Sequence, residues 1–232
     1  MVLISILWLI RANSSKSCES IDIVGLHLNY KNRDETDLEQ EFLEHWCRHN
    51  NINLICYGME ELRRSVTDRE YYEKETKRIR FEQYGKVLQK FSSSGIFLAH
   101  HKGDEQENTF SNIINGKGLL SLSAMQEITM IDGIGILRPL INLPKQDIYD
   151  FAHMYGIPYF KDTTPDWSNR GKLRNKLFPS MEEIYGKKYL LNFTNLSKES
   201  RQWKDMINNM IIQPFIQTNV TFVTNPTTNN IE

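Results

Sequence analysis

A short stretch near the middle of the chain brings several ionisable side chains close together. The segment "IFLAHHKGDEQEN", residues 96–108, ends an apolar run at His100 and reaches Asp104 and Glu107 within a few residues. If a helix extends back through this turn, His100, Asp104 and Glu107 occupy positions i, i+4 and i+7 and share one face. The simpler explanation is structural, because the helix dipole stabilises a carboxylate in the first turn. The alternative is a substrate site at the carboxyl edge of a parallel sheet.

A second segment, residues 159–179, combines basic, polar and aromatic side chains. The sequence "YFKDTTPDWSNRGKLRNKLFP" contains the basic residues Arg170, Lys172, Arg174 and Lys176, with Trp167 and Phe178 on either side. Cations beside aromatic rings suit an RNA phosphate backbone and an unstacked base. A solvated surface loop explains the same composition. The same two explanations apply to Arg78 and Arg80, which lie on a long predicted helix.

The composition limits the classes of protein to be considered. The chain has 232 residues, of which 40% are apolar, and a formal net charge of −1. This predicts one domain with a substantial core, and any RNA contact must come from a local basic patch. The three cysteines form no C-x-x-C motif, so neither a disulfide framework nor a zinc or iron–sulfur site is indicated, and a reduced cytosolic setting is expected. The apolar run of residues 1–10 lacks the basic start of a signal peptide and is too short to span a membrane.

The elements that must position these residues alternate between strands and helices. Apolar, β-branched runs predict strands at residues 21–28, 52–58, 95–100 and 133–139. Helical periodicity predicts helices at residues 1–11, 37–50, 69–91, 107–114 and 144–156. This βαβα order predicts an α/β fold with a doubly wound, Rossmann-like parallel sheet, in which ligands bind beyond the carboxyl ends of the strands. We expect this domain to cover residues 1–180, followed by a helical extension at 181–216 and a disordered tail at 217–232.

Several short motifs, taken in order, resemble those of the tRNA(Ile)-lysidine synthetases, which belong to the PP-loop (N-type) ATP pyrophosphatase superfamily. "AHHKGDEQEN" resembles that family's A-H-H-x-D-D-Q-x-E-T, and "GKGLLSLSAM" resembles its G-x-G-x-x-G-L-x-x-M. "LHLNYKNR", "TKRIRF", "ILRPL", "YFKD" and "SNRGKLRN" resemble its remaining elements. The resemblance runs from Met1 to about Leu196 and is strongest over residues 98–179. It implies an adenine nucleotide alpha hydrolase-like fold, and it favours functional roles over the structural explanations given above.

The resemblance also implies a reaction. ATP adenylates the C2 oxygen of the wobble cytidine in the CAU anticodon of tRNA(Ile), and the amine of free L-lysine then displaces AMP. Mg²⁺ held by carboxylates would assist the departure of pyrophosphate. The implied partners are therefore tRNA(Ile), L-lysine and ATP, with no membrane. The oligomeric state stays open, and a homodimer is one option.

The roles of individual residues follow from the same resemblance. The residues expected to act in catalysis are Asp104, Glu107 and Arg174, and Asp104 is also expected to bind the metal. The residues expected to line the nucleotide are His27, Ala99 and His100. The residues expected to contact RNA phosphate are Arg80, Arg170, Lys172 and Lys176. The division of roles between Asp104 and Glu107 stays open.

The sequence departs from the family pattern in several places. The family's first strand and its S-G-G-x-D-S loop, whose amides cradle the pyrophosphate, have no counterpart, because "MVLISILWLI" resembles the family's segment just after that loop. Gly103 replaces an acidic residue of the family pattern, Asn115 replaces a basic one, and "SNRGKLRN" is short. We therefore expect weak or absent ligase activity, owing either to a truncated gene model or to a degenerate protein.

Two other functions stay open. One is another PP-loop tRNA-modifying enzyme of the thiolase type, although the lack of a C-x-x-C motif counts against it. The other is a non-catalytic remnant that binds nucleotide or RNA.

Overall fold

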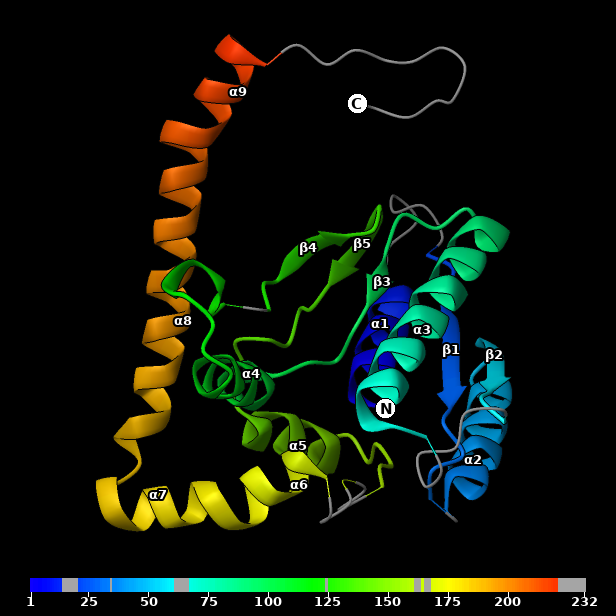
Figure 1. Cartoon of the computed structure of the whole chain (residues 1–232). Coiled ribbons are helices and arrows are strands. Elements are labelled where there is room, and N and C mark those ends of the chain that lie inside the picture. Colours follow the sequence, from blue (N-terminus) through cyan, green and yellow to red (C-terminus); the bar gives the residue numbers. More distant parts are fainter. Residues whose placement is uncertain are drawn as a thin grey trace. The chain divides into compact units, whose positions relative to one another are not determined.

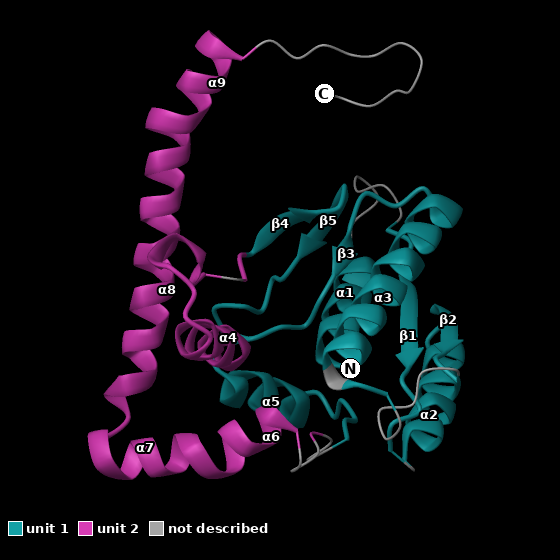
Figure 2. Cartoon of the chain, in the orientation of Figure 1, with its two compact units in different colours: residues 1–101, 127–163 teal, residues 102–126, 164–232 magenta. Residues whose placement is uncertain are grey.

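The chain divides into two compact units. The computed structural model describes residues 1–13, 21–33, 35–60, 67–123, 125–160, 164 and 168–220. Unit 1 comprises Met1–His101 and Glu127–Thr163, and unit 2 comprises Lys102–Gln126 and Thr164–Glu232 (Figure 2). This division differs from the expected boundary at residue 180. The helix that follows the third predicted strand belongs to unit 2, because it packs against a long helix near the C-terminus.

All strands of the described residues lie in unit 1, where they form two sheets (Figure 1). The first sheet pairs β1 (Val24–Asn29) with β2 (Asn53–Gly58) in parallel. The second sheet pairs β3 (Ile96–Phe97) with β5 (Ile134–Leu137) in parallel and β5 with β4 (Ile128–Ile131) in antiparallel. The parallel pairs confirm the parallel α/β class that the apolar, β-branched runs predict.

The antiparallel strand β4 was not predicted. Its outward side chains, Ile128 and Met130, are both about two-thirds exposed but apolar. The sequence of β4 therefore lacks the alternation of apolar and polar residues that is typical of a half-buried strand. The hairpin has a clear sequence signal nonetheless. Asp132 and Gly133 both have positive φ angles, 50° and 76°, and they form the two-residue turn between β4 and β5. An Asp-Gly pair is one of the sequences that such a turn favours.

Four helices accompany the strands of unit 1. They are α1 (Val2–Asn13), α2 (Thr36–His49), α3 (Arg69–Phe91) and α5 (Lys145–Met154). One core cluster contains Ile23, Cys47 and Ile52, and another contains Val2, Ala152 and Ile157. Leu38, an apolar residue in the first turn of α2, is 63% exposed. At about 100° per residue it lies on the side of the helix opposite Cys47.

The bounds of α3 agree with the predicted helix at residues 69–91. Asp68 caps its N-terminus, since its side chain accepts hydrogen bonds from the backbone N–H groups of Glu70 and Tyr71. Ser92 ends the helix in the left-handed conformation. No helix in the described part of the chain has the length and apolar character needed to cross a bilayer.

All secondary structure in the described residues of unit 2 is helical. Its elements are α4 (Lys102–Ile114), η1 (Leu119–Ser121), α6 (Asn169–Lys172), η2 (Leu173–Leu177), α7 (Phe178–Tyr185), α8 (Lys188–Ile207), η3 (Asn208–Ile212) and α9 (Gln213–Asn219). The turn η1 is a 3-10 helix, whereas η2 and η3 are π-helical. The predicted tail begins inside α9, and residues 221–232 lie outside the described residues.

Polar contacts join α4 to α8. Gln106 donates to the Leu190 carbonyl and to Thr194 Oγ1, each at 3.0 Å. Ser197, which is fully buried, donates to Glu105 Oε1 at 2.9 Å. The carboxylate of Glu105 is itself only 7% exposed, and burial raises its pKa against the opposing effects of the Ser197 bond and nearby basic residues.

The raised pKa of Glu105 predicts a pH-dependent stability. A carboxyl group whose pKa is higher in the folded protein stabilises the fold below its unfolded pKa, about 4.3, and loses that contribution as the pH rises through the folded value. Glu105→Gln, which keeps the acceptor but never ionises, should therefore raise the melting temperature at pH 7 and change it little at pH 4. Thermal unfolding at several pH values tests this, with exposed Glu183→Gln as the control. An equal shift at pH 4 and pH 7 would contradict the expectation.

Candidate functional site

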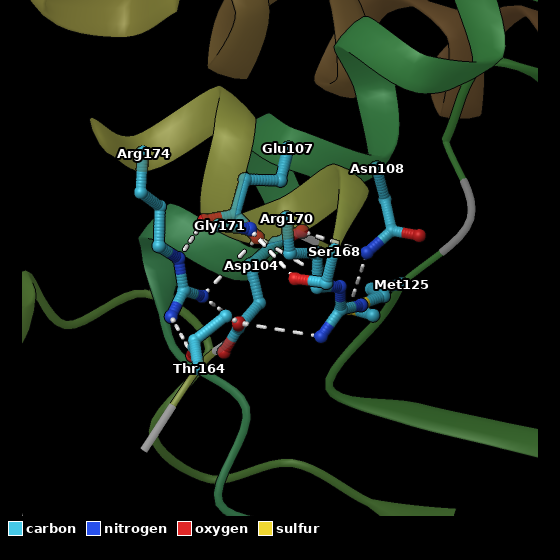
Figure 3. A network of polar contacts seen from close by, with 9 residues as sticks. All are labelled: Asp104, Glu107, Asn108, Met125, Thr164, Ser168, Arg170, Gly171 and Arg174. Carbon is cyan, nitrogen blue, oxygen red and sulfur yellow. Dashed lines mark hydrogen bonds and ion pairs between the residues drawn. The ribbon is translucent and has the colours of Figure 1, made fainter. Parts of the chain in front are cut away.

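Two carboxylates of α4 meet two arginines of the α6–η2 segment within unit 2 (Figure 3). Arg174 donates through Nε to Glu107 Oε1 and through Nη2 to Glu107 Oε2 at 3.1 Å. The same Nη2 donates to Asp104 Oδ1 at 3.0 Å. A single guanidinium therefore holds both carboxylates, although 70 positions separate Arg174 from Asp104 in the sequence.

Arg170 and Thr164 also lie beside the Arg174 guanidinium and its two carboxylates. Arg170 Nη1 lies 3.9 Å from Asp104 Oδ1, and its Nε lies 3.8 Å from Glu107 Oε2. Both distances exceed a hydrogen bond, and the Arg170 side chain is 48% exposed. Arg174 also donates to Thr164 Oγ1 at 3.4 Å. Arg174 therefore forms hydrogen-bonded ion pairs with both carboxylates, whereas Arg170 makes only longer ion-pair contacts with them.

Burial makes the pairing of Arg174 strong. The side chains of Glu107 and Asp104 are only 5% and 10% exposed. Burial alone would lower the pKa of Arg174, but its bonds to Glu107, followed by the charge of Asp104, outweigh that effect and raise it. Breaking a buried pair leaves an uncompensated charge and costs about 3–5 kcal/mol, whereas an exposed pair such as that of Arg170 contributes about 0–1 kcal/mol.

The start of α4 places the two carboxylates. Because the helix begins at Lys102, Asp104 lies in its first turn, where the dipole favours a negative charge. Asp104 and Glu107 are three residues apart and share a face. Asn108 Nδ2 donates to the Asp104 carbonyl at 2.8 Å and so braces the same turn. His100 precedes the helix. Of the three residues predicted to share one helical face, only Asp104 and Glu107 therefore lie on α4.

A separate cap positions the arginines. Ser168 Oγ accepts a hydrogen bond from the Gly171 N–H at 2.9 Å and caps the N-terminus of α6. Arg170 lies in α6, and Arg174 lies in the π-helical turn that follows it. The S-N pair of the sequence motif is thus the start of a helix. No role was assigned to Thr164, Asn108 or Ser168, yet the serine ahead of a helical stretch is a recognisable capping signal.

The arrangement around Asp104 does not fit the predicted binding of Mg²⁺. This ion selects anionic oxygen ligands, with water completing an octahedron. Among the described residues of the cluster, the charges of the two carboxylates are matched by those of two guanidinium groups, so these four side chains carry no net negative charge to attract a divalent cation. Within the described ranges, no three His, Cys, Asp or Glu side chains are spaced to hold a metal. We therefore assign no chemistry of the cluster to a metal ion.

The residues expected to line the nucleotide belong to unit 1. His27 lies within β1, whereas Ala99 and His100 follow β3, and the two strands belong to different sheets. Burial lowers the pKa of His27, and the nearby carboxylates Glu39 and Glu44 oppose that shift. His27 Nε2 is buried and has no hydrogen-bond partner. Strand pairing does not bring His27 next to Ala99 or His100, and their roles remain predictions.

The basic residues expected to contact RNA have different surroundings. Lys172 and Lys176 are exposed and lie four residues apart along α6 and η2. Arg80, on α3 of unit 1, has its Nε buried without a hydrogen-bond partner. Arg78 forms ion pairs with Glu75 and Glu82, as expected of a surface charge on a helix.

Comparison with known protein families supports the resemblance stated above. Residues 1–181 match a family model described as the PP-loop domain. The chain is similar to the tRNA(Ile)-lysidine synthase of Chlamydia felis, with 31% identity over 199 residues, which cover 85% of this chain and 62% of that protein. It is also similar to the same-named protein of Chlamydia pneumoniae, with 25% identity over 197 residues, which cover 84% and 60% of the two chains. The chain thus spans about three-fifths of the length of these relatives.

Among solved structures, the chain is similar to the U34-tRNA thiolase NcsA from Methanococcus maripaludis, determined with its [4Fe-4S] cluster. The TM-score is 0.61 and the sequence identity 14%, over 85% of this chain and 67% of that one. At this identity the likeness concerns the fold alone, and it confirms the adenine nucleotide alpha hydrolase-like class. Since the family model covers well over half of the sequence, the chain belongs to the PP-loop domain family.

Proposed function

We propose that this protein is a tRNA-modifying enzyme of the lysidine synthetase type, which uses ATP to join free lysine to the wobble cytidine of a tRNA with a CAU anticodon. The observation that carries the proposal is the convergence of Asp104 and Glu107 on Arg174. Membership of the PP-loop family and similarity to curated tRNA(Ile)-lysidine synthases support it.

The charges of the cluster are complementary to those of free lysine. At neutral pH lysine carries one carboxylate and two ammonium groups. Asp104 and Glu107 can accept hydrogen bonds from an ammonium group, and the guanidinium of Arg174 can hold a carboxylate through two parallel bonds. In the structure these three side chains satisfy one another. Lysine binding would replace internal ion pairs with ion pairs to the substrate, and the groups involved are already largely desolvated.

The same carboxylates can serve the chemical step. The attacking amine of lysine must lose a proton before it displaces AMP from the adenylated cytidine. Asp104 and Glu107 both lie within hydrogen-bonding distance of one guanidinium, so either is placed to receive that proton. Arg174 would then compensate the charge of the remaining carboxylate.

Other residues of the chain are assigned to ATP and RNA. We assign His27, Ala99 and His100 to the nucleotide, and Arg80, Arg170, Lys172 and Lys176 to RNA phosphate. The 232 residues contain no S-G-G-x-D-S sequence that could wrap the ATP phosphates in backbone amides.

The described cysteines do not favour a thiolase-type reaction. Such chemistry requires a thiolate or a cluster ligand, and a thiol ionises at neutral pH only where its pKa is lowered. Cys47 is 2% exposed, and burial raises its pKa. Burial, together with a hydrogen bond to Glu44, raises the pKa of Cys56 to about 11. Both thiols are therefore protonated at pH 7.

The proposed reaction predicts a lysine-dependent change of one nucleoside. The purified chain, incubated with ATP, lysine and a tRNA(Ile) transcript that carries a CAU anticodon, should add a lysyl group to the wobble cytidine. Mass spectrometry of digested tRNA measures the product, and a transcript with uridine at the wobble position is the control. Incorporation of sulfur from an added donor would contradict the proposal, and tRNA binding without any product would favour a non-catalytic role.

Replacing Arg174 should weaken lysine binding far more than replacing Arg170. Lysine at position 174 keeps the charge but cannot hold both carboxylates, so Arg174→Lys should weaken lysine binding by about 100-fold and lower the stability by about 2 kcal/mol. The matched Arg170→Lys should change the affinity by less than about threefold, because that side chain is half exposed. Calorimetric titration with lysine and thermal unfolding measure both effects. Equal losses in the two variants would exclude a special role for Arg174.

Lys172 and Lys176 should contribute to RNA binding through charge. Replacing both with Ala should weaken binding of the tRNA transcript and reduce the slope of log Kd against log salt by about 1–2, the expected effect of losing two phosphate contacts. The control replaces Lys187 and Lys188, which are also exposed, with Ala. A salt slope that changes equally in both double variants would indicate only a general charge effect.

A further inference from the structure

The two π-helical turns in the described residues have the same relation to proline. The turn η2 begins at Leu173 and precedes Pro179, and η3 begins at Asn208 and precedes Pro214 with the same spacing. In each case the residue just before the proline donates its N–H five residues back. Phe178 donates to the Leu173 carbonyl, and Gln213 donates to the Asn208 carbonyl.

Proline explains both wide turns. It has no N–H to donate, and in a regular α-helix its ring collides with the carbonyl four residues earlier. Adding one residue to the preceding turn moves that carbonyl aside, so that the helix continues without breaking. The segment from Asn169 to Tyr185 does continue through Pro179, with helical geometry on both sides. The repetition at Pro214 indicates that the proline, rather than the local packing, sets the width of the turn.

The η2 turn and the residue that follows it both contact α4. On its far side the Phe178 ring packs against Phe110 of α4, with 5.8 Å between ring centroids. Tyr189 of α8 fixes the same residue by donating its hydroxyl to the Phe178 carbonyl at 2.8 Å. Within the turn, Arg174 reaches Glu107 of α4 (Figure 3). The Phe178–Phe110 and Arg174–Glu107 contacts can therefore form together only at a particular angle between Phe178 and Arg174 around the helix axis.

A regular α-helix would change that angle. One added residue rotates the preceding residues by up to about 100° relative to the following ones. If the segment relaxed to α-helical geometry while Phe178 kept its packing, the Arg174 side chain would turn away from its present direction. The Pro179 ring is exposed, so its influence on Arg174 runs through the backbone rather than through side-chain packing.

We propose that Pro179 is a positioning residue for Arg174: it enforces the π-helical turn that aims the guanidinium at Asp104 and Glu107. Only the lysine-binding part of this inference rests on the proposed function. The geometric part concerns the Arg174–Glu107 bond itself and can be measured on the protein without substrate.

The geometric test compares Pro179→Ala with Pro214→Ala, since Pro214 follows the other π-helical turn and lies far along the chain from the cluster. The readout is solvent exchange of the Arg174 Nε–H by ¹⁵N NMR, with Arg174→Lys used to assign the signal. We expect exchange at least tenfold faster in Pro179→Ala and unchanged in Pro214→Ala. Unchanged protection in Pro179→Ala would overturn the proposal, whether or not the protein binds lysine.

A stability measurement separates positioning from a merely structural role. Because Pro179→Ala would turn Arg174 away from its buried partners, it should weaken lysine binding at least tenfold and lower the melting temperature of the wild-type chain, but change the melting temperature far less in the Arg174→Lys background, where that pairing is already weakened. Pro214→Ala should leave lysine affinity unchanged. An equal drop in melting temperature in the wild-type and Arg174→Lys backgrounds would show that Pro179 only supports the fold. If the wild-type chain binds no lysine, the proposed function fails, and the exchange measurement still decides the role of Pro179.

Discussion

The two buried carboxylates of α4 impose the constraint on which unit 2 depends. Asp104 and Glu107 are almost sealed from water, where an unpaired charge costs several kcal/mol, so the fold must bring a cation to them. Arg174 supplies that cation from a segment distant in sequence. Its neighbours in the chain are therefore also constrained: Ser168 must start the helix and Phe178 must anchor it. Successive residues of α4 meanwhile bond to α8, which ties the helical region together.

Local sequence patterns were sufficient to predict most elements of unit 1. Apolar, β-branched runs predict the four strands that form the two parallel pairs, and the capping residue Asp68 agrees with the start of α3. Patterns failed where position depends on distant partners. The third strand is only Ile96–Phe97 by strand pairing, although the Leu98 N–H still bonds to the Leu137 carbonyl. The strand β4 escaped prediction because its outward side chains are apolar, so the Asp-Gly turn was the better signal.

The candidate site was only partly predictable. The order of several weak motifs singled out Asp104, Glu107 and Arg174, and the structure brings these three side chains into contact. The position of Arg170 beside the carboxylates could not be read from a sequence that equally suits an exposed RNA contact. The expected metal role of Asp104 illustrates a general limit. Acidic residues in a motif indicate that a positive charge lies close to them. The sequence alone does not show whether that charge belongs to a metal ion or to an arginine.

A cluster that is electrically balanced on its own has a consequence for substrate choice. A simple cation or anion would have to break the Arg174 pairs and leave one partner buried without compensation, at a cost of several kcal/mol. A zwitterion such as a free amino acid replaces both partners at once, so each buried charge regains an opposite charge. Under the proposed function, the pairing itself would therefore discriminate against singly charged ligands. Under the same proposal, Arg174 must contact both carboxylates before the ligand binds. The geometry of the π-helical turn η2, which contains Arg174, would therefore affect binding.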